Sequence, residues 1–244
     1  MHETKRGLVL REVAYREADM MLTVLTESGG KVAAAARGVR RKNSKLSAAV
    51  QPLAYSEFSF YEGGGRTTVN EAEPIELFFE LRTDLVKFAL ASYFSELLEV
   101  TADAEVENPE LIRLGLNSFY ALAKLNKDPR LVKAAFELRV VRYAGYQPSL
   151  GVCPVCGKAP SRPVFSLTNG ALYCATCPKV GKTIEVDAGV LAAMHHVLSC
   201  DLKKIFSFRL DEQGMNTLSL LAEEFLLEHF ERSFKTLSFY RDLA

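Results

Sequence analysis

The fold is indicated most directly by residues 55–70, which run Tyr55-Ser56-Glu57-Phe58-Ser59-Phe60-Tyr61, then Gly63-Gly64-Gly65, then Thr67-Thr68-Val69-Asn70. The partly alternating aromatic run predicts a strand, the glycines predict a hairpin turn, and the β-branched run predicts a returning strand. Three more short apolar runs precede this hairpin, at residues 8–13, 21–26 and 31–37. Five short strands within residues 1–73 are typical of a small Greek-key barrel such as an OB-fold.

The hydrophobic period changes from Pro74 onward. Apolar residues then recur at helical spacing, at Leu77, Phe78, Leu81, Leu85, Phe88 and Leu97. Asn108-Pro109 and Asp128-Pro129 each place a capping residue before a proline, which predicts two further helix starts, and the second helix is expected to end at Gly145. Asp187 predicts the cap of a helix that reaches Leu198, and one long final helix is expected over residues 215–240.

Four cysteines form two pairs with metal-ligand spacing. The pairs are Cys153-Pro154-Val155-Cys156 and Cys174-Ala175-Thr176-Cys177, and 17 residues separate them. This spacing falls within the window of about 15–20 residues that is typical of a four-cysteine zinc site. Thr168-Asn169-Gly170 lies between two apolar runs and predicts a hairpin that would return the second pair beside the first. Four thiolates leave no open coordination position, so we expect a structural Zn²⁺ and no catalytic role for it.

These elements predict an α+β protein with four segments. We expect an OB-fold domain at residues 1–73, a helical domain in two parts at 74–149 and 183–244, and a zinc module inserted at 150–182. The chain has 244 residues, of which 48% are hydrophobic and 25% charged, as in an ordinary globular protein. No apolar run is long enough for a transmembrane helix, and a signal-peptide core is lacking at the start, so no membrane association is expected. Paired rather than scattered cysteines favour the reducing cytoplasm.

The net charge is zero, but the charges are unevenly distributed. No acidic residue occurs between Glu27 and Glu57, whereas six basic ones do: Lys31, Arg37, Arg40, Arg41, Lys42 and Lys45. A second stretch without acids, from Leu150 to Thr183, carries Lys158, Arg162, Lys179 and Lys182. Two basic stretches in an otherwise acidic chain indicate a polyanionic partner, and the first one predicts a nucleic-acid interface on the barrel.

Two other functions are compatible with these features. A zinc-stabilised scaffold could use its basic stretch to bind an acidic protein partner. A metal-dependent enzyme acting on nucleic acid is the other alternative. The deaminase pattern H-x-E followed by P-C-x-x-C is not met, because His229-Phe230-Glu231 follows the cysteines and neither pair is preceded by proline. The sequence also offers no nucleophile–base pair, so we expect no enzymatic activity.

Several blocks resemble the bacterial RecO family of DNA repair proteins. They are Tyr15-Arg16-Glu17-Ala18-Asp19, Ala36-Arg37-Gly38-Val39-Arg40-Arg41, Gln51-Pro52-Leu53, Phe136-Glu137-Leu138-Arg139 and Gly145-Tyr146-Gln147-Pro148, the last leading into the first cysteine pair. The blocks occur in the expected order over most of the chain.

The resemblance implies a non-enzymatic recombination mediator that is cytoplasmic and associated with the nucleoid. Such proteins bind single- and double-stranded DNA, anneal complementary strands, and act with RecR to load RecA onto DNA covered by single-strand binding protein. The resemblance also implies that the helical domain binds the acidic tail of single-strand binding protein. Arg139 and Arg142 are the cations we consider for the carboxylate at the end of that tail.

Overall fold

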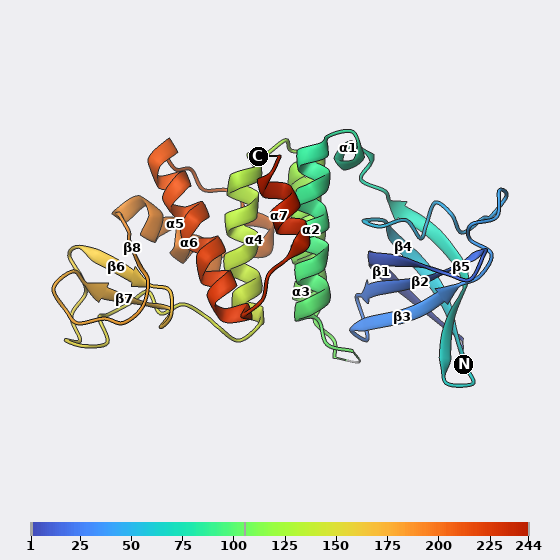
Figure 1. Ribbon diagram of the computed structural model, residues 1–244, viewed down its shortest axis with the longest axis horizontal. Coiled ribbons are helices and arrows are strands. Elements are labelled where there is room, and N and C mark those ends of the chain that lie inside the picture. Colours follow the sequence, from blue (N-terminus) through green and yellow to red (C-terminus); the bar gives the residue numbers. More distant parts are fainter. Residues whose placement is uncertain (1, 105, 244) are drawn as a thin grey trace. The chain divides into compact units, whose positions relative to one another are not determined.

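The computed structural model describes residues 2–104 and 106–243. They form two compact units, Met1–Leu125 with Phe234–Ala244 and Asn126–Ser233. The first unit contains the strands drawn in blue to teal in Figure 1. These strands are β1 (His2–Tyr15), β2 (Asp19–Thr26), β3 (Lys31–Ala36), β4 (Tyr55–Gly63) and β5 (Arg66–Glu76).

The five strands close into a barrel in the order β1-β2-β3-β5-β4, with β1 also pairing with β4. All neighbours are antiparallel except β3 and β5, whose short parallel contact at Ala35↔Thr68 and Ala36↔Val69 completes the barrel. The long strand β1 pairs with β4 through residues 2–8 and with β2 through residues 7–15, and a register shift with β2 between Val9 and Arg11 bends the strand. This topology confirms the OB-fold expectation.

Inward side chains of the strands fill the barrel, as the alternation in β4 predicts. Phe58 and Phe60 are buried and stack at 5.4 Å between ring centroids, and they pack in one cluster with Val9, Leu22 and Val24. The turn-rich segment 37–54 adds Val39 and Val50 to the same cluster, so it is held against the barrel although it has no regular structure.

The remaining elements of the first unit are helical: α1 (Phe79–Arg82), α2 (Leu85–Thr101), α3 (Pro109–Ala123) and α7 (Lys235–Arg241). Strand β5 extends through Pro74 to Glu76, so helical structure begins later than the hydrophobic spacing indicates. Pro74 lies beside the irregularity at Tyr55/Ser56 in the β4–β5 ladder, a position where a missing N–H is tolerated. The start of α3 is confirmed, because Asn108 Oδ1 accepts from the Leu111 N–H at 3.0 Å.

The second unit comprises α4 (Pro129–Tyr143), a three-stranded sheet, α5 (Ala188–Ser199), a 3₁₀ turn (Leu202–Lys204) and α6 (Glu212–Phe230). The sheet has the order β7-β6-β8, from β6 (Pro163–Ser166), β7 (Ala171–Cys174) and β8 (Thr183–Glu185). The predicted hairpin around Asn169-Gly170 is therefore confirmed. It packs on α6 through Phe165 and Phe225, whose rings meet edge to face at 5.3 Å.

The prediction of one final helix over residues 215–240 is wrong. Helix α6 ends at Phe230 because Glu231 takes a left-handed conformation, with φ of 48°, and Phe234 is extended before α7 begins. The two helices bury their apolar faces in different units: α6 packs on α4, while Phe234 contacts Tyr93 of α2 at 5.9 Å between ring centroids.

No helix in the described part of the chain combines the length and apolar character needed to cross a membrane.

Candidate nucleic-acid interface and metal centre

The basic segment 37–45 lies on the barrel surface directly after β3. Arg37, Arg40, Arg41, Lys42 and Lys45 are all exposed, and none of the five forms an ion pair within the described residues. Their charges are therefore not neutralised by ion pairs in the part of the chain that the structure describes. An exposed, uncompensated group of cations is the arrangement that meets phosphate groups.

Two backbone N–H groups of this segment donate to Ala18 and Asp19, where the β1–β2 turn leads into β2. Asp19 Oδ1 accepts from the Gly38 N–H at 2.8 Å, and the Ala18 carbonyl accepts from the Arg40 N–H at 3.0 Å. Gly38 has a φ of +66°, a conformation that a side chain would strain, and the Arg41 side chain passes 3.6 Å from where a Cβ would stand. The glycine thus lets the chain turn sharply and present successive arginines on one surface.

A groove beside this segment follows the outer face of β2 and β3. Its volume is about 410 Å³, and it extends from the β1–β2 turn to the β4–β5 turn. Tyr15, Arg16, Arg37 and Arg66 line it, together with Met21, Ala33 and Ala35 on the strands. The face of strands 2 and 3 between these two turns is where OB-folds bind oligonucleotides.

Lys31 is not brought together with the other predicted cations. It lies at the opposite end of β3 from Arg37, and its Nζ donates to the Glu99 carbonyl in the last turn of α2 at 2.6 Å. A cation at a helix C-terminus interacts favourably with the helix dipole. The structure therefore gives Lys31 a contact between the barrel and α2, and its part in DNA binding stays a prediction.

Arg16 and Arg66 are cations of this surface that the sequence reasoning missed. Both are exposed and line the groove, but they are far apart in the sequence, Arg16 in the turn after β1 and Arg66 at the start of β5. Arg66 follows the three glycines of the predicted hairpin, and Arg16 lies in the turn after β1. A search for basic residues at the two turns that flank strands 2 and 3 would have found them.

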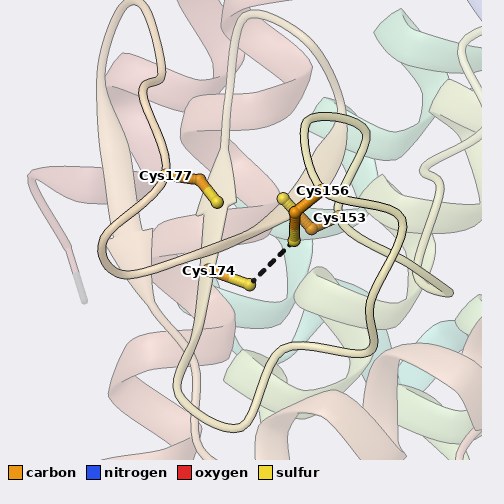
Figure 2. A group of neighbouring side chains, drawn as sticks. All are labelled: Cys153, Cys156, Cys174 and Cys177. Atoms are coloured by element: carbon orange, nitrogen blue, oxygen red, sulfur yellow. Dashed lines mark hydrogen bonds between the residues drawn. The ribbon is translucent and has the colours of Figure 1, made fainter.

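The four paired cysteines meet in the second unit, as predicted. Their Sγ atoms all lie within 4.8 Å of one another, and Cys156 and Cys174 are 3.6 Å apart (Figure 2). Zinc–sulfur bonds of about 2.3 Å in a tetrahedron would place sulfurs about 3.8 Å apart, so the spacing fits such an ion. Each pair has a tight turn: the Gly157 N–H donates to the Cys153 carbonyl at 2.8 Å, and the Cys177 N–H donates to the Cys174 carbonyl at 3.2 Å.

The environment of the sulfurs differs between the two pairs. Burial raises the pKa of Cys153, but backbone N–H groups of Cys174, Cys156 and Val155 outweigh it and lower the pKa to about 6. Burial and the neighbouring thiols raise the pKa of Cys177 to about 12. Neighbouring thiolates repel one another, so each thiol opposes ionisation of the others, and a bound divalent cation would offset this repulsion. A set of four soft sulfur donors selects zinc or iron.

The basic residues of the same module have different surroundings. Lys179 Nζ donates to the carbonyls of Cys174, Ala175 and Cys177 at 3.3, 2.7 and 3.1 Å, so it braces the second cysteine turn. Lys182 pairs with Glu224 of α6 at 2.9 Å. Half of the module's basic residues thus have structural contacts, while Lys158 and Arg162 are exposed.

The two arginines considered for a partner's tail point to the end of α5. Arg139 is 4% exposed, and its Nε and Nη2 donate to the carbonyls of Val197 and Cys200 at 2.8 and 2.6 Å. Arg142 donates to the Leu198 carbonyl. Both guanidinium groups therefore satisfy carbonyls at the C-terminus of α5. Their contact with a partner stays a prediction.

Helix α4 carries a further charge cluster that the sequence did not indicate. Lys133 Nζ lies 2.8 Å from Glu137 and 2.6 Å from Glu223 of α6, with the Lys133 and Glu137 side chains 3% and 0% exposed. Burial lowers the pKa of Lys133, but the two carboxylates outweigh it, so the pKa is raised above its ordinary value. This cluster connects α4 to α6 inside the unit.

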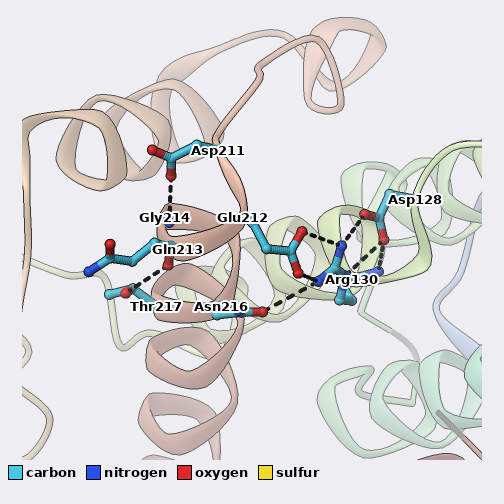
Figure 3. Close-up of polar contacts among 8 residues, drawn as sticks. All are labelled: Asp128, Arg130, Asp211, Glu212, Gln213, Gly214, Asn216 and Thr217. Atoms are coloured by element: carbon cyan, nitrogen blue, oxygen red, sulfur yellow. Dashed lines mark hydrogen bonds and ion pairs between the residues drawn. The ribbon is translucent and has the colours of Figure 1, made fainter.

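The same two helices are also connected at their starts. Arg130 reaches Glu212 at 2.5 Å and Asp128 at 3.0 Å, and it donates to the Asn216 side chain at 3.3 Å (Figure 3). Asp128 also caps α4 by accepting from the Arg130 N–H at 2.8 Å. The Glu212 and Asp128 carboxylates raise the pKa of Arg130. These contacts hold the starts of α4 and α6 together.

A closed five-stranded barrel of OB topology, joined to helices that carry a four-cysteine cluster, defines a class of OB-fold proteins with a helical domain and a metal-binding insertion. Comparisons with known proteins give the family. The family described as "Recombination protein O N terminal" matches residues 1–78, and "Recombination protein O C terminal" matches residues 82–238.

Curated proteins named DNA repair protein RecO are similar over nearly the whole chain. The one from Acetivibrio thermocellus is 30% identical and covers 97% of this chain and 95% of its own length. The one from Caldicellulosiruptor saccharolyticus is 32% identical, covering 97% and 96%. The one from Heliobacterium modesticaldum is 34% identical, covering 90% and 82%. This chain belongs to the RecO family of DNA repair proteins, and its role lies in DNA repair.

Proposed function

We propose that this protein is a non-enzymatic mediator of recombination in DNA repair. It binds single- and double-stranded DNA through the barrel, anneals complementary strands, and acts with RecR to load RecA onto DNA covered by single-strand binding protein. The observation that carries the proposal is the exposed cationic segment 37–45, whose charges are not paired within the described residues. It lies beside a groove on the face that OB-folds use for oligonucleotides.

Annealing follows physically from such a surface. Two complementary strands repel each other through their phosphates, and a cationic surface that binds both backbones lowers this repulsion. Backbone contacts do not distinguish base sequence, so any complementary pair can be brought together. The groups described here position and neutralise DNA, and the proposal requires no bond to be made or broken by the protein.

The metal module has a structural role in this proposal. Cys153, Cys156, Cys174 and Cys177 would hold Zn²⁺ in a closed site, which braces the hairpin on α6. The segments 1–73, 74–149 with 183–244, and 150–182 then act as DNA-binding, helical and metal-bearing parts of a cytoplasmic protein associated with the nucleoid. The acidic tail of single-strand binding protein would bind the helical part, with Arg139 and Arg142 as the cations to test.

The experiment that tests the function is annealing of complementary strands coated with single-strand binding protein, with and without RecR. We expect annealing by the wild-type protein and its loss when Arg37, Arg40 and Arg41 are changed together to glutamate. Retention of DNA affinity by this triple variant at moderate salt would contradict the site. If the wild-type protein bound no DNA but captured an acidic protein partner, the scaffold function would replace the proposed one. Product strands that carried nicks or altered bases would instead indicate an enzyme.

A further inference from the structure

We propose that the groove on β2 and β3 binds unpaired nucleotides, with Tyr15 as a stacking surface for a base and Arg16, Arg37 and Arg66 as contacts for the flanking phosphates. This inference rests on the proposed DNA-binding function and adds the kind of strand that the groove selects. The groove's volume of about 410 Å³ falls in the range of about 300–1,000 Å³ that is typical of sites for small organic groups.

The floor of the groove is apolar, and two of the three strand residues that form it are alanines. Met21 and Ala35 are register partners on neighbouring strands, and Ala33 lies two residues before Ala35 on the same face. Two alanines side by side on this surface leave the space that larger residues would fill. An apolar floor suits the face of a base or a sugar, and it gives nothing to a phosphate.

The wall of the groove at the β1–β2 turn is aromatic. Tyr15 is the last residue of β1 and is 39% exposed, so its ring is accessible from solvent. The Arg16 guanidinium carbon lies 5.1 Å from the centre of the Tyr15 ring, a cation–π distance. Arg16 has a φ of 58°, which is uncommon for a residue with a side chain and is often found at functional sites. The turn thus holds a cation against an exposed ring at the edge of the groove.

Three cations surround this floor and wall. Arg16 and Arg37 lie at one end, and Arg66, the first residue of β5, lies directly after the β4–β5 turn at the other. Among the described residues that line the groove, Asp19 is the one acid, and its carboxylate already accepts from the Gly38 N–H. A ring and an apolar floor between arginines match the alternation of base and phosphate along a single strand.

A duplex does not offer the same groups. Its bases are stacked inside the helix, so their faces are not available to Tyr15 unless a base is unpaired. Duplex DNA can still meet the exposed cations at Arg40, Arg41, Lys42 and Lys45, which need only a backbone. The two surfaces would therefore have different specificities. The groove would bind an unpaired strand, whereas segment 40–45 would bind both single- and double-stranded DNA.

The test compares wild-type protein with Tyr15→Ala and Tyr15→Phe, using fluorescence anisotropy at one salt concentration. The probes are an oligothymidine strand, a blunt DNA hairpin, and a strand of equal length in which the central nucleotides are abasic. We expect Tyr15→Ala to weaken binding of the thymidine strand about 5- to 150-fold, the range for loss of one aromatic stack. Hairpin binding should change less than about twofold, and Tyr15→Phe should behave as wild type because a ring is kept.

The abasic strand supplies the decisive comparison. If Tyr15 stacks on a base, removal of the bases weakens wild-type binding and changes Tyr15→Ala binding little. Tyr61→Ala is the matched control, because Tyr61 is an aromatic residue of β4 with 42% exposure that does not line the groove. Ala35→Leu provides an independent variant, which should fill the floor and weaken only the single-strand probes without a change of charge.

Two results would overturn the inference: equal effects of Tyr15→Ala on strand and hairpin, or no effect on either. Circular dichroism would reveal a folding defect in Tyr15→Ala. In that case the test is the effect of Ala35→Leu on the single-strand probes compared with the hairpin. Failure of the proposed function is distinguishable, because wild-type protein would then bind none of the probes.

Discussion

The salt dependence of DNA binding gives the most quantitative test of the cationic barrel surface. Each phosphate that a protein cation neutralises on single-stranded DNA contributes about −0.7 to the slope of log affinity against log salt concentration. The surface offers seven exposed cations: Arg16, Arg37, Arg40, Arg41, Lys42, Lys45 and Arg66. If all of them meet phosphates, the slope is about −5, and affinity falls about 1,000-fold between 50 and 200 mM salt.

The perturbation is the simultaneous change of Arg37, Arg40 and Arg41 to glutamine, which removes charge without adding the repulsion of an acid. Four cations then remain, so the slope should become about −3, and the same rise in salt should cost only about 50-fold in affinity. The assay is fluorescence anisotropy of a labelled oligothymidine strand, titrated at five or more salt concentrations. The slope, rather than the affinity at one salt concentration, counts the contacts.

A matched control changes three exposed cations outside the barrel, Lys203, Lys204 and Arg209, to glutamine. It lowers the net charge equally, and we expect its slope to equal that of the wild type. An unchanged slope in the barrel variant would refute the reasoning. An equal loss in the control would show that net charge, and not this surface, governs binding.

Two further predictions concern the second unit. Lys133→Met leaves the buried carboxylate of Glu137 without its cation and should destabilise the unit by about 3–5 kcal/mol, measured by chemical denaturation. The loss of stability relative to the wild type should shrink as pH falls, because protonation of the buried carboxylate removes its uncompensated charge. Adding Glu137→Leu should restore most of the loss; a single variant as stable as the wild type would contradict the role of the cluster. The purified protein should carry one zinc per chain by metal analysis, and Cys174→Ser should lose it, whereas Cys200→Ser, outside the cluster, should keep it. Chelation should lower the melting temperature, because an ion a thousandfold above its Kd stabilises the folded state by about 4 kcal/mol. Wild-type protein that is metal-free and melts at the same temperature with and without chelator would be evidence against a zinc site.

The features that sequence predicted best are those with local causes. Asn108 and Asp128 predict the starts of α3 and α4, because a capping residue and a following proline act within one helical turn. The cysteine cluster was also predictable, since the spacing of each pair and the Asn169-Gly170 turn specify the geometry over a short stretch. Alternation in β4 likewise identified a strand whose inward residues fill the barrel.

The features that sequence missed depend on partners that are remote along the chain. Nothing near Glu231 predicts its left-handed conformation, because the break between α6 and α7 follows from two different packing surfaces. Arg16 and Arg66 belong to one groove only once the barrel is closed. The sequence shows that Lys31 and Arg139 are cations, but it does not show which groups accept their hydrogen bonds. In the structure both donate to carbonyls near the ends of helices.

The return of α7 to the first unit has a consequence for how the protein is made. The second unit is continuous, Asn126–Ser233, and can fold as soon as its own residues have left the ribosome. The barrel unit begins earlier but lacks α7, so Tyr93, which is fully buried in the folded protein, has no Phe234 to cover it until the whole second unit has been synthesised. Domains that emerge first usually fold first. Here we expect the order of completion to be reversed: the unit with the cysteine cluster is complete while the barrel unit still lacks α7.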